Sequence, residues 1–134
     1  MRCDGWESRL VEFLEREGQT PFAWGERDCV LFASDAAVLL TGKDPAAEGR
    51  GKYRTKEEGF AVLRAIGCSQ PGLMDAHFSR IRPSEAQRGD IVYRKREGGA
   101  SFGVVYGGAA FYRSPETGLV KEPVALADAA WRVE

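Results

Sequence analysis

An apolar run from Cys29 to Leu40 follows directly on Asp28 and constrains the fold more than any other segment. Apolar side chains on nearly every side of a helix predict that it is buried in the core. Asp28 suits the N-cap and Gly42 the end of this helix. A cysteine in the first turn lies at the positive end of the helix dipole, which favours the thiolate and lowers the thiol pKa. The run therefore predicts a central helix with Cys29 as a candidate nucleophile.

The loop before this helix contains Phe22, Trp24 and Gly25. The two aromatic side chains either pack in the core or belong to a site, and Gly25 turns the chain. Asp28 is expected to act as a helix cap rather than as a catalytic acid. Trp24, Gly25 and Asp28 are thus candidate supporting residues for Cys29.

Helical periodicity, capping signals and strand alternation give the remaining elements. They predict helices at about 5–17 and 55–66, one helical turn at 73–78 and a short helix at 126–131. They predict strands at 90–94, 102–106, 110–113 and 118–122, with a turn at 97–99. Helices first and strands second indicate an α+β domain, in which the central helix packs on one face of a small antiparallel sheet. Four aromatic residues of these strands either face the helices or lie outward for a partner, namely Phe102, Tyr106, Phe111 and Tyr112.

The 134 residues suit a single domain, 1–134, and the net charge of −1 gives no electrostatic reason to bind nucleic acid or a membrane surface. The N-terminus has no apolar stretch typical of a signal peptide, and no segment suits a membrane span, so we expect synthesis and assembly in a cytoplasm. Three cysteines without CxxC spacing argue against disulfides and against a zinc site. We expect no metal and no cofactor.

His77 is the only histidine, and it has no clear relation in the sequence to Cys29. It could act as a base only if the segment at 70–80 folds over the N-terminus of the central helix. A histidine between Ala76 and Phe78 is more typical of a partly exposed helix position. His77 is therefore only an alternative candidate for the base.

Three segments together resemble the NlpC-type cell-wall peptidases, a papain-like family. Pro21, Phe22, Trp24, Gly25, Asp28, Cys29 and Phe32 resemble the family's Pro-Tyr-x-Trp-Gly-Gly-x-x-x-x-Asp-Cys-Ser-Gly-Phe pattern, with a shorter interval between Gly and Asp. The segment 88–92 resembles its Gly-Asp-Leu strand, and 101–107 lies where the family has His-Val-Gly-Ile-Tyr-x-Gly. The resemblance covers most of the chain and implies a papain-like fold.

On this alignment Ser101 stands where the family has its catalytic histidine, and a serine cannot serve as that base. Arg113 stands at the third position, in a segment that resembles Phe-Ile-His-Ala. An imidazole would both hold the thiolate and protonate the leaving amine. Arg113 could still hold a thiolate without transferring a proton. The resemblance thus implies a peptidase scaffold with its base replaced.

The Phe-x-Trp-Gly-x-x-Asp-Cys motif, the Thr-Gly-Lys-Asp-Pro loop with Tyr53-Arg54 and the Ala-rich C-terminus also resemble small tail proteins of bacteriophages, prophages and gene transfer agents. That resemblance implies a structural or adaptor component of a phage tail tip, located in the virion tail, whose partners are other tail-tip or hub proteins. One alternative is an active cysteine peptidase or amidase that cleaves peptidoglycan, with a base from His77 or a partner chain. Another is a bacterial module that binds a small ligand.

Overall fold

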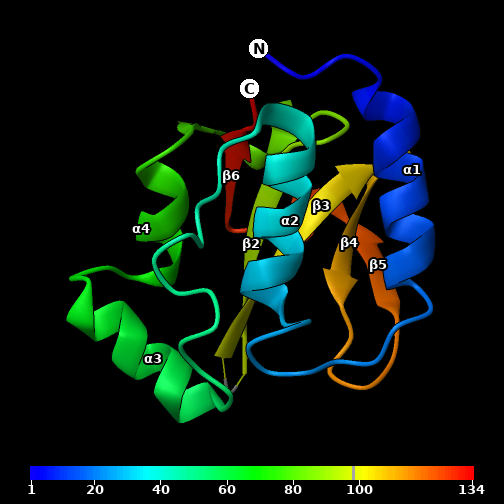
Figure 1. Ribbon diagram of the computed structural model, residues 1–134. Helices are drawn as coiled ribbons and strands as arrows, with labels where there is room; N and C mark the ends of the chain where they lie inside the picture. The colour runs from blue at the N-terminus through cyan, green and yellow to red at the C-terminus, as the bar shows by residue number, and fades with distance from the viewer. Residues whose placement is uncertain (98) are drawn as a thin grey trace.

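The computed structural model describes residues 1–97 and 99–134, and Figure 1 shows the arrangement of its elements. The helices are α1 (Trp6–Glu17), α2 (Cys29–Thr41), α3 (Lys56–Ala65) and α4 (Gln70–Asp75). The strands are β1 (Ser79–Ile81), β2 (Ile91–Arg96), β3 (Gly99–Tyr106), β4 (Ala109–Arg113), β5 (Leu119–Pro123) and β6 (Ala129–Arg132), and two 3₁₀ turns are η1 (Pro83–Glu85) and η2 (Val124–Leu126). The predicted turn at 97–99 includes Gly98, which lies outside the described residues.

The six strands form one sheet in the order β1-β6-β2-β3-β4-β5, and every neighbouring pair is antiparallel. Figure 1 shows α2 lying across the middle of the sheet, with α1 on one side of it and α3 and α4 on the other. The α+β architecture expected from the sequence is therefore confirmed, with the central helix packed on an antiparallel sheet.

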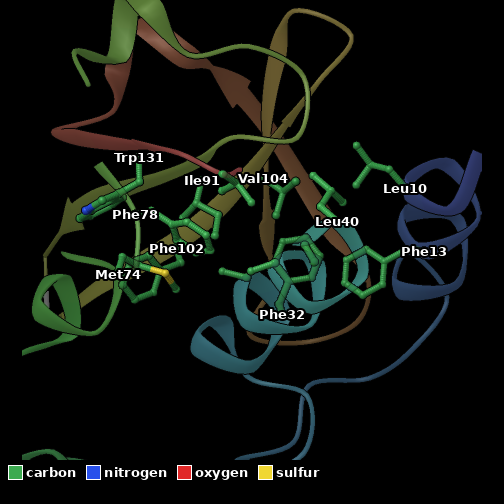
Figure 2. Close-up of a cluster of buried hydrophobic side chains, with 14 of the residues drawn as sticks. Leu10, Phe13, Phe32, Leu40, Met74, Phe78, Ile91, Phe102, Val104 and Trp131 are labelled. Atoms are coloured by element: carbon green, nitrogen blue, oxygen red, sulfur yellow. The ribbon is translucent and has the colours of Figure 1, made fainter. Parts of the chain in front are cut away.

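The main core lies between α2 and the helix-facing side of the sheet. Phe32 from α2 stacks on Phe13 from α1, with ring centroids 5.5 Å apart. Figure 2 shows these side chains continuing through Phe102 toward Trp131. Asp28 caps α2 through its side chain, and Gly42 ends the helix with a φ of 79°. The run after Asp28 is thus buried as its composition predicts.

The other face of the sheet is also covered. Val92, Val105 and Tyr112 are among the buried side chains there, and segments around η1 and η2 pack over them. Phe102 and Tyr112 lie on opposite faces and are 0% and 1% exposed. Neither side chain offers an exposed surface to a partner.

The predicted C-terminal helix at 126–131 is wrong. The 3₁₀ turn η2 ends at Leu126, and β6 then enters the sheet between β1 and β2. Alternation explains the strand, because Trp131 packs on the helix side while Ala130 packs on the opposite side. A run of small residues before a tryptophan suits a helix locally, but the sheet pairing decides its conformation. The short strand β1 was also not predicted.

A buried carboxylate ties both ends of the chain to the sheet. Asp90 is 0% exposed and accepts hydrogen bonds from Arg2 Nη2, Arg132 Nε and the backbone amides of Gln87 and Val133 at 2.8–3.0 Å. The bond from the Gln87 amide joins Asp90 to the loop before β2. Through its bonds to Arg132 and Val133, Asp90 also holds the end of β6 beside β2.

Candidate functional site

Asp28 organises the loop before α2. Its carboxylate is 1% exposed and accepts hydrogen bonds from the backbone amides of Leu31 and Gly25, each at 2.9 Å, and from the Tyr53 hydroxyl at 2.5 Å. Burial, together with the bond to Asp28, raises the pKa of Tyr53. Three donors satisfy the carboxylate, as a buried polar group requires. Asp28 is therefore a cap that also holds the loop and Tyr53.

Position 25 requires glycine, both for its backbone conformation and because of the residues around it. Its φ is +81°, and a Cβ at this position would lie 2.0 Å from the carbonyl oxygen of Tyr53. Trp24 packs edge-on against Phe22, with centroids 4.9 Å apart, yet remains 38% exposed. Trp24 thus lies at the surface of the site rather than in the core.

Cys29 begins α2 and is partly exposed. Burial raises its thiol pKa to about 11, and the Asp28 carboxylate adds to the rise. Hydrogen bonds from the backbone of Phe102, Cys29 and Val30 lower the pKa but do not offset the burial. The amides at the helix N-terminus thus lower this pKa as expected, but desolvation of the charged form outweighs them, so the thiol pKa is raised overall. At neutral pH Cys29 is a protonated thiol.

The Phe102 backbone N–H, which directly follows Ser101, bonds to the Cys29 thiol, whereas the hydrogen bond described for the Ser101 hydroxyl is to Arg96. Ser101 Oγ accepts a hydrogen bond of 2.7 Å from Arg96 Nε, and Arg96 lies over the Tyr112 ring on the other face of the sheet. Arg96 also forms a salt bridge of 2.9 Å with Glu122. Because side chains alternate along a strand, Phe102 points toward α2 instead. Phe102 thus contributes its backbone to the surroundings of Cys29, while its side chain is buried in the main core.

Arg113 lies on β4 with a side chain that is almost fully buried. It donates to a carboxylate oxygen of Glu17 at 2.5 Å, and to the backbone carbonyls of Glu17 and Thr20 at 3.1 and 2.9 Å. These groups belong to the C-terminal end of α1 and to the loop after it. The guanidinium that could have held a thiolate thus joins β4 to α1.

His77 follows α4 and is exposed. It lines a cavity whose wall also includes Trp24, Asp28 and Val30, and Cys29 is not among the described wall residues. The fold thus places His77 on the same side of α2 as the loop of the motif, without showing a contact to the sulfur.

Two residues of the site were not identified from the sequence. Tyr53 approaches Asp28 from 25 positions away, and no local pattern signals such a contact. Phe102 could have been found, since alternation with the buried Val104 places it on the helix-facing side.

The chemistry available at Cys29 is that of a neutral thiol that is bonded to the backbone amides of Phe102, Cys29 and Val30. Within residues 1–97 and 99–134, no group of three or more His, Cys, Asp or Glu is placed to hold a metal ion. No helix in this part of the chain is long and apolar enough to cross a membrane.

No curated protein matches the sequence. Among solved structures, the chain is similar to the NlpC/p60 domain of the peptidoglycan hydrolase SagA, with a TM-score of 0.57 and 18% identity. The match covers 93% of this chain and 97% of that one, and at this identity it shows the fold: papain-like, of the NlpC type. A family model matches residues 1–133, and the chain belongs to that family, which is described as Domain of unknown function (DUF6950).

Proposed function

We propose that this protein is a non-hydrolytic relative of the NlpC-type peptidases, in which the catalytic base has been replaced. The observation that carries the proposal is the surroundings of Cys29: the hydroxyl of Ser101, at the family's base position, is bonded to Arg96, and burial raises the thiol pKa to about 11. General acid–base assistance is typically worth about 10²–10⁴-fold in rate, and a serine hydroxyl bonded to a guanidinium does not supply it. The thiol of Cys29 is then a remnant of the peptidase scaffold.

We further propose that the protein is a structural or adaptor component of a phage tail tip, assembled in the host cytoplasm and located in the virion tail. The support is the sequence resemblance to small tail proteins through the Trp24–Cys29 motif and the Tyr53-Arg54 loop. In the structure these two segments meet, because Tyr53 bonds to Asp28 and packs its carbonyl against Gly25. The partners would be other tail-tip or hub proteins.

The test has two arms. Purified protein is incubated with peptidoglycan fragments beside a Cys29→Ala variant, with the SagA domain as a positive control, and cleavage is followed by mass spectrometry. We expect no products above those of the variant. Separately, we expect mass spectrometry to find the protein in purified tails of a phage or prophage that encodes it. Cleavage that requires Cys29 would refute the loss of hydrolysis, and consistent absence from tails and their assembly intermediates would refute the tail role.

A second candidate is an active cysteine peptidase acting on peptidoglycan, with a base from His77 or from a partner chain. One observation favours it, namely that His77 lines the same cavity as Trp24 and Asp28. This candidate predicts cleavage that is lost in both Cys29→Ala and His77→Ala variants, or cleavage that appears only when a partner is added. The same assay separates the two candidates.

A further inference from the structure

A cavity of about 280 Å³ lies between the N-terminus of α2 and the helices α3 and α4. Figure 1 shows α3 and α4 on the same side of α2, away from α1. Cys29 is not among the described wall residues of this cavity. Its walls nevertheless include Trp24 and Asp28 from the loop before α2.

The apolar face of α3 forms much of the wall. Four residues of this face line the cavity, namely Gly59, Phe60, Val62 and Leu63, and Ile66 directly after the helix also lines it. An amphipathic helix normally buries its apolar face against other elements. In α3, all of which is described, no residue is fully buried. The helix therefore turns its apolar face toward a space that other side chains do not fill.

The polar residues of the wall include Glu48, Lys56 and His77 as well as Asp28 and Gln70. Asp28 and Gln70 have partners within the protein. Asp28 accepts three hydrogen bonds, including the one from Tyr53, and the Gln70 side-chain oxygen accepts a bond of 3.1 Å from Tyr93. A charged group buried against Asp28 or Gln70 would lose its hydration without gaining a free partner. The remaining walls are mainly apolar, and two partly exposed aromatic side chains, Trp24 and Phe60, border the opening. This combination suits an uncharged ligand.

We propose that this cavity is a binding site for an uncharged, mostly apolar small molecule of aromatic or branched aliphatic character. An apolar cavity of about 150 Å³ in another protein holds benzene, so the present volume suits a ligand of roughly ten to twelve non-hydrogen atoms. The proposal does not depend on the tail role or on the loss of hydrolysis. Its chemistry also differs from that of a charged peptide substrate.

The test uses two probes that share a ring system and differ in charge. Calorimetric titration of the full chain with 2-naphthol is expected to show saturable binding of one molecule per chain. Naphthalene-2-sulfonate is expected to bind at least about tenfold more weakly, since burying its charge in a mainly apolar wall beside the Asp28 carboxylate costs hydration free energy. Equal affinities, or no saturable binding of 2-naphthol, would overturn the proposal. So would displacement of 2-naphthol by a peptidoglycan stem peptide, which would make the cavity a peptide groove.

Two matched variants test whether 2-naphthol binds in this cavity. Val62→Trp fills the space from α3 and is expected to weaken 2-naphthol binding at least about tenfold. Val38→Trp is the control, because Val38 is 39% exposed on α2 and is not among the described wall residues. Circular dichroism checks that both variants fold. Equal loss or equal retention of binding in two folded variants would place the site elsewhere and contradict the assignment.

Discussion

Replacing Gly25 by alanine is expected to destabilise the protein by about 2–5 kcal/mol. The left-handed backbone, with φ at +81°, costs a residue with a Cβ about 1–2 kcal/mol. The overlap with the Tyr53 carbonyl oxygen, at 2.0 Å from the added Cβ, forces the loop and Tyr53 apart and adds about 1–3 kcal/mol. The free energy of unfolding from urea denaturation measures the sum.

Gly42→Ala is the matched control. Gly42 has a φ of +79°, but a Cβ there meets nothing within 4 Å. This variant should therefore show only the backbone cost of about 1–2 kcal/mol. If the two variants lost equal stability, the close packing of the loop against Tyr53 would be wrong.

Arg113→Ala is expected to cost about 3–5 kcal/mol of stability, because it leaves the Glu17 carboxylate buried without its partner. The two side chains are 0% and 9% exposed, so water cannot replace the lost guanidinium. Arg54→Ala serves as a control. Its ion pair with Glu26 is formed by side chains that are 75% and 52% exposed, and such a pair contributes less than about 1 kcal/mol.

The Arg113→Ala variant also distinguishes a structural role of Arg113 from a catalytic one. If Arg113 only joins β4 to α1, the pKa of Cys29 in folded Arg113→Ala protein stays near that of the wild type. A double-mutant cycle with Glu17→Ala should also show coupling between the two residues. A large change in the Cys29 pKa without loss of stability would instead support the triad position that the alignment suggests.

Much of the fold follows from local patterns. The caps at Asp28 and Thr55 start α2 and α3 as predicted, with Leu31 and Glu58 as the donors to their side chains. The α+β class and the strands at 91–113 follow from the change of periodicity from helix to strand. These features depend on neighbours in the sequence, and such neighbours are visible without a structure.

The wrong predictions concern residues whose structure depends on contacts with residues far away in the sequence. The segment that forms β6 becomes a strand because it pairs with β1 and β2, and its own residues do not signal this. Arg113 pairs with Glu17, which is 96 positions away in the sequence. The pKa of Cys29 depends mainly on the burial of its thiol, and the dipole argument alone does not include that burial. Local reasoning therefore predicted the buried helix that begins at Cys29 but not the electrostatics of its thiol.

The most direct test of the unactivated thiol is the alkylation rate of Cys29 against pH, measured with iodoacetamide in a Cys3→Ser, Cys68→Ser background. The urea-unfolded protein is the control and should titrate near the ordinary thiol value of about 8.5. For the folded protein we predict that the rate rises through pH 10 with a midpoint of about 11. A plateau reached below about pH 8.5 would show an ion-paired thiolate and contradict the account.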